Sequence, residues 1–263
     1  MYKGIDHIAL AAKDIAQATE FFQSAFKLDL IMPLSYPADG VHTNLVFSLG
    51  PDNELELMGP LGDHGFLVQF LERNGEGLHH LALEVTDIDR HTEELEQNGV
   101  RVFGRTDALG MRFTFLHPKS TLLVGMQLMQ RKPQKPSRDP MIKGIDYVAI
   151  RVEQPQEGRH FFLRQLGADM VSSEREPVLD CWSDHFVLGK AHFLLLYDFR
   201  SGSAVAAPEG LHHVALKVDS LSDAVRHLEQ YNVLPLENWS GDHSALLSPD
   251  HTFGCVFRLI QRS

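Results

Sequence analysis

The sequence predicts an α+β fold in which four β-α-β-β-β units pair into two modules, each with a cupped mixed sheet. The first observation is a repeat: the stretch Gly77–Val85 returns almost unchanged at Gly210–Val218, and looser relatives at Gly4–Leu10 and Gly144–Ile150 open the two halves. Repeats at a fixed spacing indicate repeated supersecondary units. The second observation is that the same order of expected elements follows each copy.

The repeated strand alternates in polarity, which predicts what each side contacts. In the second copy Leu81 and Leu83 share one side, which favours packing against a helix. His80 lies on the other side, next to the small residue Ala82. One imidazole among small side chains leaves room for a ligand, so this side is expected to form a concave, ligand-holding surface.

The first half is expected to contain two β-α-β-β-β units joined by a short helix. Helical spacing of apolar residues after Asp14 predicts the first long helix, and Gly50–Asn53 predicts a hairpin turn. Asp87 is a suitable helix start and Gly99 a suitable helix stop. The expected strands are 4–10, 28–32, 44–49, 54–58, 78–85, 100–103, 111–116 and 122–129, and the expected helices are 14–27, 66–74 and 88–98.

A polar, proline-rich stretch separates the two halves. Arg131–Pro140 has three prolines and no apolar residue, so it predicts an exposed linker. The expected organisation is a first module at 1–130, a linker at 131–142 and a second module at 143–263. The second module is expected to have the same order of elements as the first. Its expected strands are 143–152, 169–171, 185–188 and 191–197, its expected helix is 156–166, which ends at Gly167, and a final unit spans 211–259.

Composition excludes several classes of function. The chain has 263 residues, enough for two domains, and its net charge of -11 argues against nucleic acid as a partner. No apolar run approaches the ~20 residues of a membrane span. Met1–Gly4 leads directly into an expected strand, so no signal peptide is expected, and Cys181 and Cys255 are expected to be buried thiols. We therefore expect a cytoplasmic protein without membrane contact.

Specific motifs support a family resemblance over nearly the whole chain. The four paired units resemble the vicinal oxygen chelate superfamily, which includes glyoxalases, bleomycin resistance proteins and extradiol dioxygenases. The first half is most similar to the methylmalonyl-CoA epimerase branch, through the runs Ile5–Ala9, Glu56–Leu61, Phe70–His80 and Phe115–Thr121. The resemblance implies a cupped sheet around one divalent metal ion.

The resemblance places the metal ligands on four strands of the first half. They fall on His7, Glu56, His80 and Gln127, a set of nitrogen and oxygen donors that suits Fe, Mn, Co, Ni or Zn. Strand alternation supports this independently, because Glu56 and Gln127 are each flanked by apolar residues that face the other way. His79 lies on the apolar side and is expected to be structural.

The matching positions of the second half do not form a metal site. They are Tyr147, Leu194, His213 and Arg258, and arginine has no lone pair to donate. One metal ion per chain is therefore expected. Tyr147, Lys217 and Arg258 fit either an anion site or a structural salt-bridge cluster, and the sequence does not choose between the two.

The resemblance also bears on the chemistry, through the two glutamate bases of the epimerase branch. One base position is Gln127 here, and glutamine cannot take a proton from carbon. The other matches Ala38, so that Asp39 serves only if the loop register shifts by one, and Glu56 is the best base near the metal.

The expected function is a metal-dependent lyase or isomerase, glyoxalase-like or acyl-CoA-epimerase-like, acting through a metal-stabilised enolate on a small oxygen-chelating substrate. One alternative is a non-haem Fe(II) dioxygenase that cleaves rings or acts on 2-oxo acids. The other is a small-molecule-binding or resistance protein without catalysis. The substrate is expected to be a thioester or another oxygen-chelating acid, since the turn 117–121 is either a coenzyme A feature or a plain tight turn. A homodimer remains open.

Overall fold

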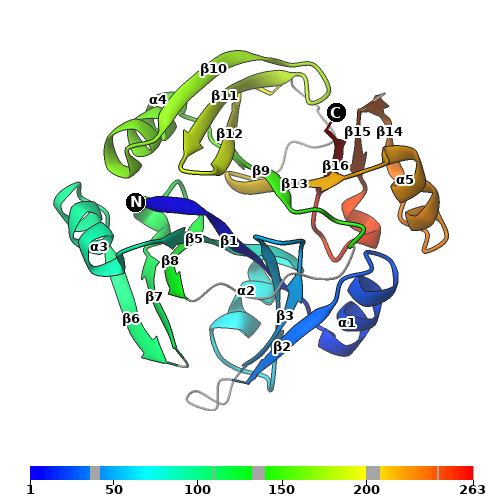
Figure 1. Cartoon of the computed structure of the whole chain (residues 1–263), viewed down its shortest axis with the longest axis horizontal. Helices are drawn as coiled ribbons and strands as arrows, with labels where there is room; N and C mark the ends of the chain where they lie inside the picture. Colours follow the sequence, from blue (N-terminus) through cyan, green and yellow to red (C-terminus); the bar gives the residue numbers. More distant parts are fainter. Residues whose placement is uncertain (36–41, 109, 132–139, 200–207, 242, 263) are drawn as a thin grey trace. The chain divides into compact units, whose positions relative to one another are not determined.

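Two eight-stranded mixed sheets, one from each half of the chain, form the framework (Figure 1). The structure is a computed structural model that describes residues 1–35, 42–108, 110–131, 140–199, 208–241 and 243–262. The first sheet has the order β2-β3-β4-β1-β5-β8-β7-β6, and the second repeats it as β10-β11-β12-β9-β13-β16-β15-β14. This confirms the predicted α+β class.

The strands of the first sheet are β1 (Tyr2–Ala11), β2 (Leu30–Ser35), β3 (His42–Ser48), β4 (Glu54–Pro60), β5 (Gly77–Val85), β6 (Val102–Ala108), β7 (Met111–Leu116) and β8 (Gly125–Arg131). Those of the second are β9 (Ile145–Arg151), β10 (Asp169–Glu176), β11 (Cys181–Leu188), β12 (Ala191–Tyr197), β13 (Gly210–Val218), β14 (Pro235–Gly241), β15 (Ser244–Leu247) and β16 (Phe257–Gln261). In each sheet, antiparallel strands flank the central strands on both sides. The pairs β3–β4 and β11–β12 are examples of this antiparallel pairing.

Two long helices of the first half begin at side-chain caps that the sequence supplies. Asp14 accepts a hydrogen bond from the Gln17 amide at the start of α1 (Ile15–Ser24), and Asp87 accepts one from the Arg90 amide at the start of α3 (Ile88–Gln97). The other helical segments are α2 (Phe66–Asn74), α4 (Pro155–His160), α5 (Leu221–Glu229), the single turns η1 (Pro118–Ser120) and η3 (Pro249–His251), and the π-helical segment η2 (Phe161–Leu166).

Several boundaries differ from the sequence prediction for identifiable reasons. β6 begins two residues later than expected, because the Val100 amide donates to Leu95 and the Gly99 amide to Glu96, a Schellman end to α3. β8 begins at Gly125 because Leu122 and Leu123 adopt positive φ angles and form the preceding turn.

The first residue of the expected linker lies at the end of a strand. Arg131 ends β8, where its Nε lies 2.7 Å from the buried Asp6 carboxylate, so this cation is part of the sheet. The rest of the expected linker up to residue 139 lies outside the described residues.

Contacts divide the chain into two compact units, and each combines parts of both halves. Unit 1 comprises Met1–Asp6, His80–Gln134 and Tyr147–His212, and unit 2 comprises His7–His79, Lys135–Asp146 and His213–Ser263. The division passes along β1 after Asp6 and along β5 after His79, so both strands belong in part to each unit.

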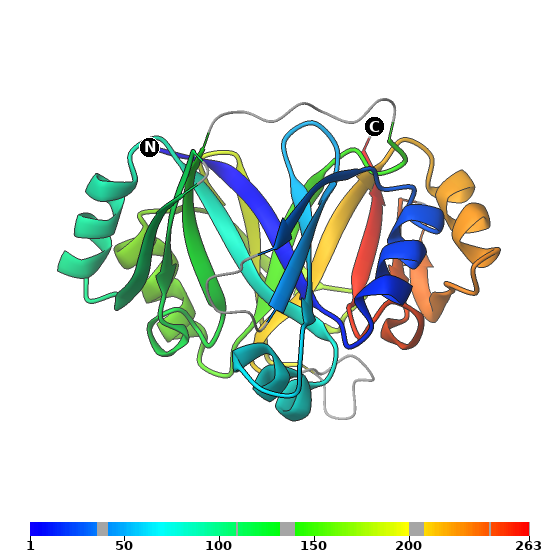
Figure 2. The ribbon, with the colours of Figure 1, turned by 90° about the horizontal axis from the view of Figure 1, so that it is seen from below.

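Within each unit the halves are joined by specific contacts. In unit 1, Asn98 and Gln165 bond reciprocally through side-chain amides and backbone carbonyls, at 3.4 and 2.9 Å. In unit 2, α1 and α5 lie side by side (Figure 2), and His227 Nε2 lies 3.3 Å from the Ser24 carbonyl oxygen. The Phe26 ring of α1 lies 5.4 Å from that of Phe257 in β16.

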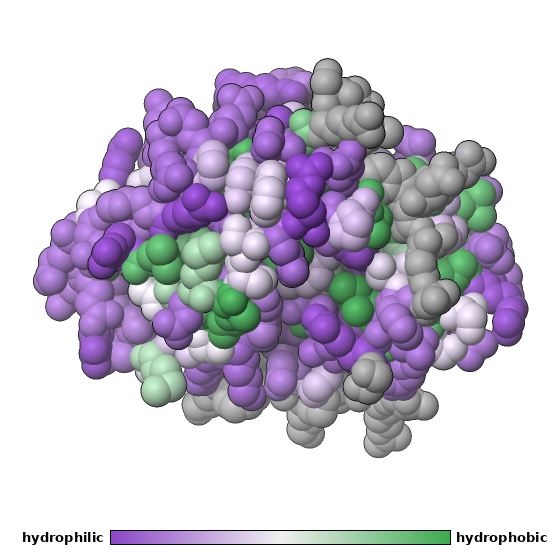
Figure 3. All heavy atoms as spheres, turned by 90° about the horizontal axis from the view of Figure 1, so that it is seen from above, coloured by the Kyte–Doolittle hydropathy of each residue, from purple (hydrophilic) through white to green (hydrophobic). Residues whose placement is uncertain are grey.

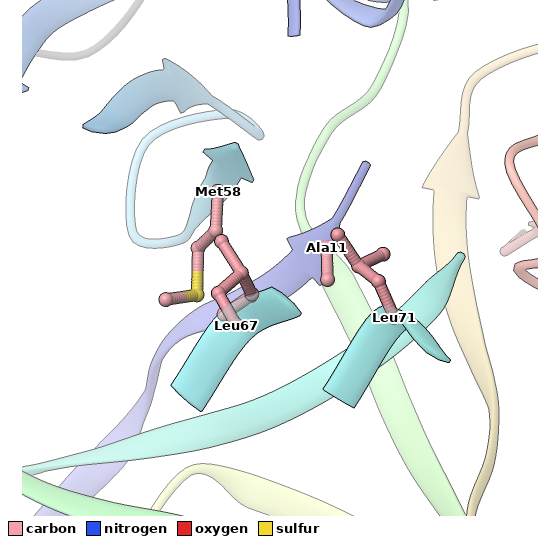
Figure 4. Packing of buried hydrophobic residues seen from close by; sticks show 5 residues of the cluster. Ala11, Met58, Leu67 and Leu71 are labelled. Carbon is pink, nitrogen blue, oxygen red and sulfur yellow. The ribbon is translucent and has the colours of Figure 1, made fainter. Parts of the chain in front are cut away.

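Helix α2 covers part of the side of β1 that the sequence left open. Ala9 and Ala11 of β1 pack with Met58 of β4 against Leu67 and Leu71 of α2. Figure 4 shows Leu67 directed toward Met58 and Leu71 beside Ala11. The small alanine side chains allow the helix to approach the sheet closely, so the ligand-holding surface is limited to the part of β1 around His7.

One face of the molecule is mostly hydrophilic (Figure 3), and the two cysteine thiols are buried. Hydrophilic side chains cover most of the face in Figure 3, and hydrophobic residues form separate small patches. Cys181 and Cys255 are both free and buried, as predicted, and burial raises the pKa of the Cys181 thiol to about 12. Within the described residues, no helix is long and apolar enough to cross a bilayer.

Candidate metal centre

Three neighbouring strands bring the predicted ligands His7, Glu56 and His80 together. Ala9 of β1 pairs with Glu56 of β4, and His7 lies two residues earlier, on the same side of the sheet. β5, the other neighbour of β1, supplies His80. One ligand atom from each of the three residues lies within 4.8 Å of the others, and all three side chains are buried. This group can hold a metal ion.

The fourth predicted ligand, Gln127, lies on β8 beside β5. It pairs with Ala82, which shares its side of β5 with His80. Its Oε1 atom is buried, and no hydrogen-bond donor reaches it among the described residues. A buried acceptor without a partner costs about 1–3 kcal/mol, and a bound cation would remove that cost.

The donor set fits a divalent ion. Two imidazole nitrogens, one carboxylate and one amide oxygen suit first-row transition metals, and His7 Nε2 already lies 3.3 Å from Glu56 Oε2. A protonated imidazole would explain that contact without a metal, but it would leave Gln127 Oε1 unexplained.

One buried residue of the site, Asn44, is not among the residues predicted from the sequence. It lies on β3, and its Nδ2 donates to Glu56 Oε1 over 2.5 Å. Asn44 pairs directly with Met58, and Val46 is the partner of Glu56, so the contact is diagonal across the hairpin. Strand alternation gives the side on which Asn44 lies, but only the register between β3 and β4 shows that it reaches Glu56.

His79 packs against helix α2, which fits the structural role expected from the sequence. Its ring lies 4.6 Å from that of Phe70 and 5.9 Å from that of Phe66, both in α2. Burial lowers the pKa of His79 to about 4, an effect that nearby His42 reinforces and Glu56 opposes. The imidazole is therefore neutral at pH 7 and packs against the helix.

Among the described residues, no other predicted position belongs to the metal group. Asp39 and Ala38 lie outside the described residues. Elsewhere in the described part of the second half, no comparable group of His, Cys, Asp and Glu is found. Tyr147 and His213 are buried, Leu194 is half-buried, and Arg258 Nη2 donates to Ser244 Oγ over 3.1 Å.

Each half of the chain matches a model of the same protein superfamily. Residues 6–115 and residues 144–237 each match the Glyoxalase/Bleomycin resistance protein/Dioxygenase superfamily. The chain belongs to this superfamily, as a tandem member with two modules of the same kind.

Within the superfamily, the first half is similar to methylmalonyl-CoA epimerases. The mitochondrial enzyme of Dictyostelium discoideum is 30% identical over 131 residues, which is 48% of this chain and 78% of the relative. The ethylmalonyl-CoA/methylmalonyl-CoA epimerase of Cereibacter sphaeroides is 32% identical over 120 residues, 44% of this chain and 88% of the relative. Among solved structures, a variant of Streptomyces coelicolor methylmalonyl-CoA epimerase in complex with 2-nitronate-propionyl-CoA has 27% identity and a TM-score of 0.47, covering 50% of this chain and 99% of that one.

Proposed function

We propose that this protein is a metal-dependent isomerase or lyase in which His7, Glu56, His80 and Gln127 hold one divalent ion. The observation that carries the proposal is the buried group on adjacent strands, together with the Gln127 amide oxygen, which has no hydrogen-bond partner among the described residues. A bound divalent ion would polarise a substrate carbonyl and acidify the neighbouring C–H bond.

Glu56 is the proposed base of this reaction. Its Oε2 is directed toward His7, and its Oε1 is held by Asn44. A carboxylate oxygen accepts more than one hydrogen bond, so Oε1 can take a proton from carbon beside the Asn44 bond. The same oxygen returns the proton, either to the first carbon or to its neighbour.

A single base favours a different reaction from that of the epimerases. Inversion at carbon uses a base on each face, and Gln127 cannot serve as one. We therefore propose proton transfer between neighbouring atoms, or loss of a leaving group, on a small oxygen-chelating substrate. The names of the relatives make coenzyme A thioesters the first compounds to test.

A dioxygenase is the second candidate. Two histidines and one carboxylate form the ligand set that binds non-haem Fe(II) in many oxygenases, and His7, Glu56 and His80 supply that set. The metal that the protein retains separates the two candidates.

The test is elemental analysis of the full chain purified anaerobically without added metal, beside His80→Ala. The matched control is His213→Ala, which removes the equivalent buried histidine of the second half. We expect about one ion per chain in the wild type and the control, and none in His80→Ala. Co, Ni, Mn or Zn would support the isomerase or lyase, and Fe the dioxygenase. A wild-type protein that stays empty after soaking in each ion would overturn the metal site and favour a binding protein.

A further inference from the structure

Asn44 has one satisfied and one unsatisfied end inside the candidate site. Its Nδ2 donates to Glu56 Oε1 over 2.5 Å, and because a carboxylate only accepts, this contact fixes the orientation of the amide. The other end, Oδ1, is buried and has no donor within hydrogen-bond distance among the described residues. The residue as a whole is only 3% exposed.

Burying Asn44 Oδ1 costs free energy unless a ligand donates a hydrogen bond to it. A buried acceptor without a partner costs about 1–3 kcal/mol. An apolar residue would avoid that cost, and Val46, the next residue on the same side of β3, shows that the strand accommodates one. Gln127 Oε1 has the same property but is explained by the metal, whereas the Asn44 amide is already committed to Glu56 through Nδ2.

We infer that Asn44 Oδ1 accepts a hydrogen bond from the substrate, and that the substrate is an oxygen chelator with an O–H or N–H group next to its chelating oxygens. This inference rests on the proposed function, because the donor must be presented beside Glu56. α-Hydroxycarbonyl compounds and hydroxamates belong to this class. A malonyl thioester does not, since its ionised carboxylate and thioester oxygens bear no hydrogen.

Asn44 therefore has two tasks, one for each end of its amide. Nδ2 fixes Glu56 Oε1 where it can exchange a proton with carbon, and Oδ1 selects the substrate. A residue that only supported the fold would affect all chelating ligands alike. Asn44 should instead discriminate between two chelators that differ in a single N–H group.

The probes are acetohydroxamate and N-methylacetohydroxamate, which share the same two chelating oxygens and differ at the nitrogen. Their affinities for the cobalt-loaded full chain are measured by calorimetry, and the ratio is normalised to that for free Co²⁺. We expect the wild type to prefer acetohydroxamate about tenfold, which corresponds to one hydrogen bond of ~1.4 kcal/mol. Asn44→Ala should lower the ratio to about one, while Thr43→Val, on the other side of the strand, should retain it.

The outcomes separate this inference from the proposed function. A wild type that binds both probes equally would overturn the inference and leave the metal site intact. A preference that persists in Asn44→Ala would also overturn it, because the bulk of the methyl group would then be the cause. A wild type that binds neither cobalt nor the probes would overturn the proposed function itself.

Discussion

At the scale of single residues, the site depends on which buried oxygens carry charge. Glu56 and Gln127 place one carboxylate and one amide in the proposed ligand set, and both side chains are buried. The net charge of the ligands sets the affinity for a divalent cation, since each carboxylate offsets part of its charge. Neither side chain can change without altering this balance.

Exchanging the two side chains tests their roles as ligands. Glu56→Gln should weaken the affinity for Co²⁺ by about tenfold or more, because the site loses its only carboxylate ligand, and Gln127→Glu should strengthen it. The double variant restores one carboxylate and one amide and should return near the wild-type affinity. Competition with a coloured chelator measures all three values. An unchanged affinity in both single variants would contradict the assignment.

At the scale of elements, close approach between helix and sheet fixes the position of α4. A Cβ atom added at Gly158 would lie 2.5 Å from Leu195 Cδ2 of β12, and Leu195 is fully buried. The equivalent position in α1, the fourth residue of the helix, is Ala18, which is also fully buried. In α1 and α4, a small residue therefore lies where the first turn of the helix meets the sheet.

Gly158→Ala should destabilise the protein despite the better helix propensity of alanine. The overlap with Leu195 forces repacking at a cost of about 1–3 kcal/mol, and the propensity gain offsets up to ~1 kcal/mol. Urea unfolding should show a lower free energy of unfolding. Gln156→Ala, at an exposed position of the same helix, should change it by less than about 0.5 kcal/mol. A Gly158→Ala variant as stable as the control would contradict the close contact.

At the scale of the whole molecule, sheets and compact units divide the chain differently. Each sheet is built from one half, while each unit takes residues from both halves. Aromatic packing between Phe26 and Phe257 in unit 2, and the reciprocal bonds of Asn98 and Gln165 in unit 1, join the halves. The apolar surface of either half is therefore covered in part by the other.

The two halves should behave as complementary fragments. Residues 1–131 and 140–263 produced separately would each expose the apolar surface that the other half covers, and should therefore self-associate. Mixed together, they should form a 1:1 complex of the size of the intact chain, as measured by light scattering after size-exclusion chromatography. Two fragments that stay monomeric after mixing would contradict this expectation.

The sequence by itself determined the fold class and singled out the residues of the proposed ligand group. The fourfold repeat and strand alternation are local patterns, so they give the element order, the side on which His7 and His80 lie, and the family resemblance. Helix caps such as Asp14 and Asp87 were visible for the same reason, because a cap and its amide are three residues apart.

Tertiary structure decided what depends on register and on contacts between distant residues. Asn44 reaches Glu56 only through the diagonal geometry of β3 and β4, and α2 closes over Ala9 and Ala11 only when the helix folds back onto the sheet. No local sequence pattern indicates the contacts between the two halves of the chain. These features follow from which surfaces meet in space, and hydrophobic periodicity shows that a surface will be buried without showing what will cover it.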